Sequence, residues 1–317
     1  MFTLKSGPPK KNGAAGGGAF FVRNMARFLE NKGCNVIYTL DPNIDIIFVI
    51  DPRKNSTNNY KIEEIIRYKE KNPNVKIIHR VNECDIKREK SINIEPLLLK
   101  AMKTADCVIF VSKWLESYFL KKYNIKQKTL SILNGIDTNI FHRNRPQESL
   151  NHIPFKDEKI RLVTHHFSDN YLKGFHIYNK LDEILPNYPN IEFTYIGNYN
   201  KNYKPKNIKI IGQCSGKELA DIIRSHDIYI TATQNEPGAM HYIEGMACGL
   251  PVLYCVGGGG AKEICSMAGE EYVDLKEFME KIQKIKDNYQ DYVDKIDNLY
   301  LSSHRCSNEY FTIINSI

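Results

Sequence analysis

Apolar residues along the chain fall into short runs separated by amphipathic stretches, a pattern typical of parallel α/β proteins. The run Ile44–Ile50 is almost continuously apolar, as in a central strand buried on both faces. The stretch Ala19–Asn31 repeats apolar residues with a helical period and stops before Gly33. We therefore expect strands and helices to alternate along the chain.

The same two patterns predict the other elements. The expected strands are Phe2–Ser6, Val36–Leu40, Ile44–Ile50, Val75–Ile78, Cys107–Val111, Ile160–Thr164, Ile191–Ile196, Ile208–Gly212, Ile228–Thr231 and Val252–Val256. The expected helices are Ala19–Asn31, Ile62–Lys69, Glu95–Thr104, Lys113–Tyr123, Lys217–Ser225, Pro237–Cys248 and Leu275–Leu301. This order predicts an α/β fold with parallel sheets.

A polar, proline-containing and asparagine-rich stretch at residues 141–158 divides these elements into two sets. Such composition is typical of a linker. A chain of 317 residues is long enough for two domains, each with its own core. We therefore predict an N-terminal domain at 1–145, a second domain at 146–301 and a C-terminal segment at 302–317.

The most informative stretch, residues 227–263, is predicted to form strand, loop, helix, strand and glycine loop. Glu236 follows the first strand, and side chains at the carboxyl ends of strands border the ligand crevice of open α/β sheets. Glu244 shares an apolar helix face with Met240 and Ala247, where a carboxylate needs a hydrogen-bond partner. Two glutamates at this spacing also occur by chance, with Glu236 as an ordinary loop acid and Glu244 reaching solvent.

The predicted start of that helix adds an anion site. Pro237 suits the first helical turn, so the backbone N–H groups of Gly238, Ala239 and Met240 would be free beside the positive end of the helix dipole. The four glycines Gly257–Gly260 would bring a second run of bare backbone to the same place. Hydroxyl-accepting carboxylates around a phosphate site suit a sugar attached to a diphosphate.

Two other features of the first domain have alternative interpretations. Gly13–Gly18 with Asp41 would suit a dinucleotide-binding turn, but the glycine spacing is wrong and the loop is too long. Gly16, Gly17 and Gly18 would instead let the chain approach a phosphate, or form a plain surface loop. His79 follows the expected strand Val75–Ile78 and is either a structural or a site histidine.

The segment from Glu236 to Glu244, followed by Gly-Met-Ala-Cys-Gly-Leu-Pro-Val, resembles the E-x7-E signature of retaining family-4 glycosyltransferases. That resemblance implies the GT-B fold, with two Rossmann-like parallel-sheet domains facing a cleft. The acceptor would bind the first domain and the nucleotide-sugar donor the second. The segment from Ser302 would cross back to the first domain.

The resemblance also implies roles for individual residues. Glu236 would lie by the donor sugar, Glu244 would hold the ribose and His79 would contact a sugar hydroxyl. The implied donor-binding residues are Gly17, Gly18, Lys173, Gln213, Gly238, Ala239, Met240 and Glu244. Two departures stand out: the family's phosphate-binding Arg has no clear counterpart, with His165 or His166 near its place, and Leu133 replaces a proline.

Composition and charge limit the classes of ligand and binding partner that we expect. The net charge of +7 and the isoelectric point near 8.8 favour anionic ligands or an anionic membrane surface. Lysines are spread along the chain, so nucleic acid is not expected. No apolar run approaches the roughly 20 residues of a membrane span, and no signal peptide is evident. The eight cysteines are scattered singly, which predicts reduced thiols and a cytoplasmic protein, with membrane association left open as an alternative.

The sequence thus predicts a retaining glycosyltransferase that moves a sugar from a nucleotide-sugar donor to a glycan, lipid or other hydroxyl acceptor. No D-x-D motif is present, so we expect no metal and no cofactor beyond the nucleotide-sugar co-substrate. Two alternatives are an NAD(P)-dependent oxidoreductase and a non-catalytic nucleotide-sugar-binding protein of the same fold. The donor base, the sugar and the acceptor are not encoded in these motifs.

Overall fold

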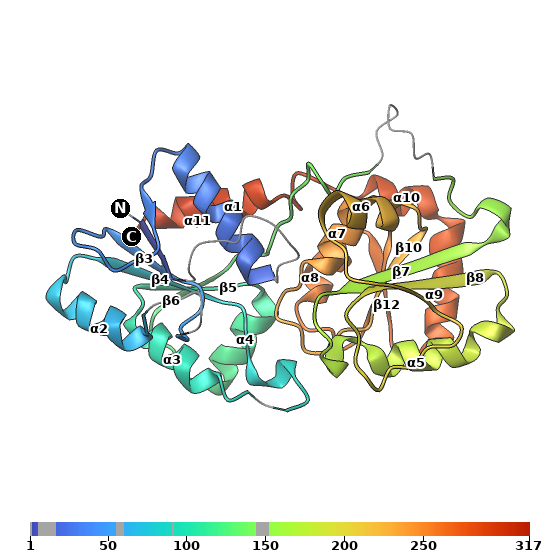
Figure 1. The fold of residues 1–317 in the computed structure, drawn as a ribbon, viewed down its shortest axis with the longest axis horizontal. Helices are drawn as coiled ribbons and strands as arrows, with labels where there is room; N and C mark the ends of the chain where they lie inside the picture. The colour runs from blue at the N-terminus through green and yellow to red at the C-terminus, as the bar shows by residue number, and fades with distance from the viewer. Residues whose placement is uncertain (1, 6–16, 55–59, 91, 144–151) are drawn as a thin grey trace. The chain divides into compact units, whose positions relative to one another are not determined.

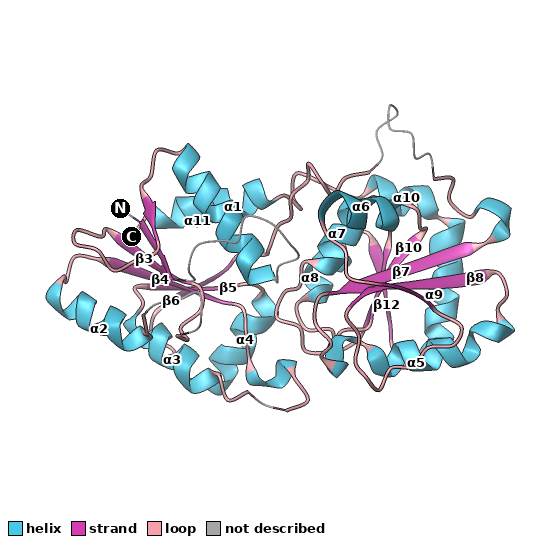
Figure 2. Cartoon of the chain, in the orientation of Figure 1, coloured by secondary structure: helices cyan, strands magenta, loops and turns pink. Residues whose placement is uncertain are grey.

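The computed structural model describes residues 2–5, 17–54, 60–90, 92–143 and 152–317. The chain forms two compact units. The N-terminal unit comprises Met1–Asp85, Ser91–Asn134 and Ser303–Ile317, and the C-terminal unit comprises Ile86–Lys90 and Gly135–Ser302. Each unit is built on one six-stranded sheet with helices on both faces (Figures 1 and 2).

The sheet of the N-terminal unit is parallel throughout, with strand order β2-β1-β3-β4-β5-β6. The direction in which strands are added reverses between β1 and β3, which makes that pair the topological switch point. The strands are β1 (Phe2–Lys5), β2 (Val36–Ile37), β3 (Ile46–Val49), β4 (Lys76–Val81), β5 (Cys107–Phe110) and β6 (Lys128–Ser131).

Helices cover both faces of this sheet. They are α1 (Gly17–Asn31), α2 (Ile62–Lys71), α3 (Glu95–Thr104), α4 (Lys113–Lys122) and α11 (Ser303–Ile314). On one face, Phe21 of α1 packs edge-on against Phe48 of β3 and Tyr310 of α11, with ring centroids 5.9 and 5.1 Å apart. Figure 1 shows α2, α3 and α4 on the opposite face. The C-terminal helix therefore belongs to the core of the N-terminal unit.

The sheet of the C-terminal unit is also parallel, with order β12-β11-β10-β7-β8-β9. Its strands are β7 (Ile160–His166), β8 (Ile191–Gly197), β9 (Lys209–Ile211), β10 (Ile228–Thr231), β11 (Val252–Cys255) and β12 (Gly269–Tyr272). Here the switch point lies between β7 and β10. Because β7 and β10 are neighbours, the loops that follow them meet at one edge of the sheet.

The helices that flank this second sheet are α5 (Phe175–Ile184), α6 (Gly216–Arg224), α7 (His241–Ala247), α8 (Ala261–Cys265), α9 (Leu275–Asp287) and α10 (Tyr289–Asp294). The main core joins Tyr178 of α5 and Phe278 of α9 to Leu162, Phe193 and Leu253 of the strands. Helices α7 and α8 contact β7, β10, β11 and β12. No helix in the described part of the chain is long and apolar enough to cross a membrane.

All the expected strands are present, with ends shifted by a few residues, but two helix predictions are wrong. The expected helix Leu275–Leu301 is interrupted at Asn288, whose φ of −124° and ψ of 28° are not helical, and it ends at Asp294. Beyond it, Asp297 Oδ1 accepts the backbone N–H groups of Leu299 and Tyr300 in a turn. The other error, at Pro237–Cys248, lies at the candidate site.

Candidate functional site

The switch point of the C-terminal unit brings two charged residues together. Strand β7 runs into a loop that ends at Lys173, and β10 runs into a loop that contains Glu236. Lys173 Nζ donates a hydrogen bond to Glu236 Oε2, and both side chains are almost fully buried. The pair therefore stands where open α/β sheets bind ligands.

Backbone hydrogen bonds fix the loop of Glu236 between two other loops. The N–H of Gln234 donates to the carbonyl of Leu172, at 2.8 Å. The N–H of Asn235 donates to Gly257, at 2.9 Å, and the N–H of Gly260 donates to Glu236, at 2.8 Å. Three segments that are distant in sequence thus satisfy one another's backbone groups.

Two glycines permit this close approach. Gly259 has a φ of +70°, and a Cβ there would lie 2.4 Å from the carbonyl oxygen of Glu236. Gly174, directly after Lys173, has a φ of +106°, and a Cβ there would lie 2.6 Å from the Cβ of Ala232. The left-handed backbone and the lack of space both require glycine. The expected glycine loop does reach Glu236, and it supports the backbone of that residue.

A second cation, Lys87, faces the same carboxylate. Its Nζ lies 3.5 Å from Glu236 Oε1, and its backbone carbonyl accepts a hydrogen bond from Asn170 Nδ2 at 2.9 Å. Burial opposes ionisation of Glu236, but the charges of Lys173 and Lys87 outweigh it and lower the pKa of Glu236 to about 2. Lys87 is not among the site residues predicted from the sequence, because a lysine in a polar turn carries no local signal.

Glu244 lies on α7, with an exposed side-chain fraction of 15%, and its Oε2 is 2.7 Å from His165 Nε2. The expected partner for this carboxylate is thus a histidine at the end of β7. His166, the next residue, is buried, and its Nε2 lies 3.1 Å from the hydroxyl of Tyr178. Burial and the charge of Lys173 hold the pKa of His166 well below its usual value, so His166 adds no positive charge here.

Helix α7 begins later than predicted. It starts at His241, and Pro237–Met240 are loop, because the contacts with Gly259 and Gly260 hold the chain around Glu236 outside a helical path. The N–H of Ala239 donates to the hydroxyl of Tyr242 at 3.0 Å. The expected row of helix-start donors at Gly238, Ala239 and Met240 is therefore wrong as a helix terminus.

The N-terminal unit holds the remaining catalytic candidate, His79. It lies within β4 rather than after it, paired in register with Val49 and Val108, and it is fully buried. Neither ring nitrogen has a hydrogen-bond partner among the described residues. Burial lowers the pKa of His79 to about 3, against a weaker opposing effect of Asp51, so the ring is neutral at pH 7.

The other predicted donor-binding residues lie in two places. Gly17 and Gly18 form the first turn of α1 rather than a loop, and Gly16 lies outside the described residues. A Cβ at Gly18 would be 3.9 Å from Asn82 Nδ2, just beyond β4. Gln213 is exposed in the loop after β9, two strands from β7 in the sheet.

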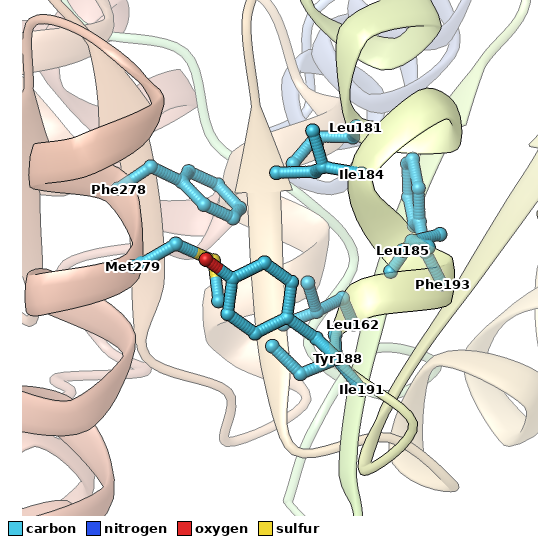
Figure 3. A pocket seen from close by; sticks show the side chains of 9 residues that line it. All are labelled: Leu162, Leu181, Ile184, Leu185, Tyr188, Ile191, Phe193, Phe278 and Met279. Carbon is cyan, nitrogen blue, oxygen red and sulfur yellow. The ribbon is translucent and has the colours of Figure 1, made fainter.

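A small apolar hollow of the C-terminal unit lies apart from these charged residues (Figure 3). Figure 3 shows Phe278 and Met279 on one side and Leu181 and Ile184 on the other, with Tyr188 between them. Its lining is completed by Leu162, Leu185, Ile191 and Phe193. The lining carries no charged group, so the hollow is a gap in core packing between α5 and α9.

Residues 151–301 of the chain match the family described as Glycosyl transferases group 1. The chain is also 28% identical over 206 residues to a probable sucrose-phosphate synthase of Thermosipho melanesiensis. That alignment covers 60% of this chain and 48% of the relative, so this chain spans about half the length of that sucrose-phosphate synthase. The matched family segment contains Lys173, Glu236 and Glu244.

Solved structures resemble the whole chain. A sucrose-phosphate synthase from Thermosynechococcus elongatus has a TM-score of 0.71 at 14% identity and covers 99% of this chain and 98% of its own. Anabaena HepE in complex with UDP-glucose has a TM-score of 0.68 at 15% identity, covering 100% and 99%. These likenesses confirm the predicted GT-B architecture of two parallel α/β units.

Proposed function

We propose that this protein is a retaining glycosyltransferase that moves a sugar from a nucleotide-sugar donor to a hydroxyl group of a glycan, lipid or other acceptor. The observation that carries the proposal is the buried Lys173–Glu236 pair at the switch point of a sheet whose sequence matches group 1 glycosyl transferases. Family 4 and the E-x7-E roles of Glu236 and Glu244 are part of the proposal.

The charges around Glu236 suit a diphosphate. Two lysines, Lys173 and Lys87, face the carboxylate of Glu236. A diphosphate carries more negative charge than a carboxylate and offers more acceptor oxygens, so it competes well for Lys173. We propose that Lys173, with Lys87 beside it, stabilises the leaving diphosphate and that Glu236 then orients the donor sugar.

In the proposed reaction the bond between the anomeric carbon and the β-phosphate oxygen breaks, and its electron pair leaves with the diphosphate. The acceptor oxygen forms the new bond to that carbon, and its proton passes to an oxygen of the leaving diphosphate. Because lysine charges serve the leaving group, the proposal requires no metal ion and no further cofactor. Neutral His79 would contact a sugar hydroxyl, and Gln213 would line the base pocket.

We further propose a UDP-linked donor, because HepE, which shares the fold, was crystallised with UDP-glucose. The competing NAD(P)-dependent oxidoreductase is not favoured, since the family match lies in the segment with Glu236 and not around Asp41. A non-catalytic binding protein would bind the same nucleotides without turnover.

The first experiment is thermal unfolding with UDP, GDP, ADP, CMP and NAD, followed by assay of nucleotide release from UDP-glucose with and without EDTA. A ligand at ~100 times its dissociation constant adds about 2.7 kcal/mol of stability. We expect a shift with UDP and release that is insensitive to EDTA. A shift with NAD alone would overturn the proposal.

Glu236→Gln separates an enzyme from a binding protein. We expect it to lower release by about 100-fold or more, the scale of losing one preorganised electrostatic contact. The matched control is Glu280→Gln, a glutamate with 62% side-chain exposure that pairs with Lys276 on the surface. Nucleotide binding without release in wild type would favour the non-catalytic alternative.

A further inference from the structure

Glu244 ends a chain of hydrogen bonds that leads into the core of the C-terminal unit. His165 Nε2 lies 2.7 Å from Glu244 Oε2, and its other nitrogen, Nδ1, lies 3.0 Å from the hydroxyl of Tyr229. That hydroxyl is also 3.1 Å from Nδ1 of His241. Tyr229 and His241 are buried, so these polar atoms depend on one another.

The contacts determine where each proton lies. His165 Nε2 faces a carboxylate and donates to it, so in the neutral ring Nδ1 accepts the hydroxyl proton of Tyr229. The oxygen of Tyr229 then accepts from the backbone N–H of His165, at 3.1 Å, and from Nδ1–H of His241. His241 Nε2 completes the series as acceptor for the hydroxyl of Thr233, at 3.4 Å.

Burial supports these proton positions. It holds the pKa of His241 well below its usual value and raises the pKa of Tyr229 well above its own, so both groups are neutral at pH 7. A Cβ at Gly245 would lie 2.2 Å from Cδ2 of Tyr229, so glycine lets the ring pack directly against α7 beside Glu244. The series is therefore held by packing as well as by hydrogen bonds.

We propose that His165 is a positioning residue that orients Glu244 toward the ribose hydroxyls of the donor nucleotide, with Tyr229 and His241 holding His165 in the required tautomer. This inference rests on the proposed function, in which Glu244 holds the ribose. It gives His165 a task different from that of the family's phosphate-binding Arg, because Nε2 of His165 is engaged by a carboxylate. Specificity for ribose over deoxyribose then depends on residues that never touch the nucleotide.

The test compares affinities for UDP, 2′-deoxy-UDP, 3′-deoxy-UDP and pyrophosphate by calorimetry. Wild type should prefer UDP over the deoxy compound that lacks the bound hydroxyl by about 10- to 100-fold, as for a hydrogen bond to a charged group. Tyr229→Phe removes only the hydroxyl and should reduce that preference by about 2- to 10-fold. Its pyrophosphate affinity should match that of wild type, since Lys173 is untouched.

Two further comparisons exclude a general packing effect. His165→Gln keeps a donor for Glu244 and should retain more of the ribose preference than His165→Leu. In a Glu244→Gln background, His165→Leu should cause no further loss, because its effect passes through Glu244. The matched control Tyr272→Phe alters another fully buried tyrosine of this unit and should keep the wild-type preference.

The outcomes distinguish this inference from the proposed function. If wild type binds UDP but Tyr229→Phe and His165→Leu keep its ribose preference, the inference is overturned and the proposed function stands. Equal affinity of wild type for UDP and both deoxy compounds overturns the inference together with the proposed ribose role of Glu244, while release of UDP from UDP-glucose would still support glycosyl transfer. If wild type binds no nucleoside diphosphate, the proposed function fails and the inference fails with it.

Discussion

The two units share one architecture but differ in what stands at their switch points. Between β7 and β10 of the C-terminal unit, a buried lysine and a buried glutamate meet, and backbone hydrogen bonds tie the loop of the glutamate to the loop of the lysine and to the glycine loop at Gly257–Gly260. In the N-terminal unit, β3 leads to Asp51, which pairs with Arg53 at 2.9 Å. Residues 6–16, which follow β1 in the sequence, lie outside the described residues.

The difference is one of solvent exposure. The side chains of Arg53 and Asp51 are 49% and 23% exposed, and ion pairs of this kind contribute about 0–1 kcal/mol. Those of Lys173 and Glu236 are 11% and 4% exposed, so removing one partner would leave a charge without solvent. A parallel sheet supplies the place for a site, but only loops packed to exclude water make its charges interdependent.

The largest effect should come from breaking that buried pair. We expect Lys173→Met to lower the free energy of unfolding by about 3–5 kcal/mol, because Glu236 then keeps a buried charge for which Lys87 is the remaining cation partner among the described residues. Lys173→Met/Glu236→Gln should regain most of this stability and none of the transfer activity. Urea denaturation measures the first quantity and nucleotide release the second.

The control for this variant is Lys276→Met, because Lys276 is 87% exposed and lies 4.0 Å from Glu280. Its loss should stay below about 1 kcal/mol. Equal stability of Lys173→Met and Lys276→Met would show that the buried pair does not differ from a surface pair.

A smaller loss of stability should come from replacing either of two glycines by alanine. The two glycines have similar positive φ angles, and one lies in each unit. Gly33 has a φ of +78° with nothing within 4 Å of a built Cβ, so Gly33→Ala should cost about 1–2 kcal/mol from the left-handed backbone alone. Gly259→Ala adds a clash with the backbone of Glu236 and should cost about 3 kcal/mol, with weaker UDP binding. Thermal unfolding measures the loss of stability in each variant, and calorimetry measures UDP binding. Equal losses of stability in Gly33→Ala and Gly259→Ala would contradict the role of Gly259 as a support for Glu236.

The smallest effect concerns acid sensitivity, which buried histidines confer on both units. Burial lowers the pKa of His79 in the native state to about 3, whereas its usual value is 6.5. Below pH 6.5 the unfolded chain therefore binds a proton that the native state does not bind, and the free energy of unfolding decreases as the pH decreases. His79→Leu should therefore reduce the stability lost between pH 7 and pH 5 by about 2 kcal/mol. Denaturation at the two pH values measures it.

Most of the acid sensitivity should remain in that variant. Burial also lowers the pKa values of four histidines of the C-terminal unit, His166, His176, His226 and His241, and these are unchanged. A variant with the wild-type pH dependence would contradict the buried, neutral state of His79. Complete loss of the pH dependence would contradict the lowered pKa values of the four other histidines.

Local patterns predicted what depends on local physics. Strand β3 and helix α3 lie where apolar periodicity places them, since burial of apolar faces drives both. Strands β6 (Lys128–Ser131) and β12 (Gly269–Tyr272) were missed, because each is a polar edge strand with no apolar run. Helices α5 and α8 were missed as well. The start of α7 was misplaced, because contacts with Gly259 and Gly260 outweigh the preference of Pro237 for a helix start.

By itself, the sequence determined the two-part α/β fold, the loop position of Glu236 and the need of Glu244 for a partner. Only the tertiary structure decided the partners. Lys173 reaches Glu236 across 63 residues, and His165 reaches Glu244 across 79, because β7 pairs with β10. Strand order and register are set by the packing of the whole sheet. No local sequence pattern therefore encodes which side chains become partners at the carboxyl ends of the strands.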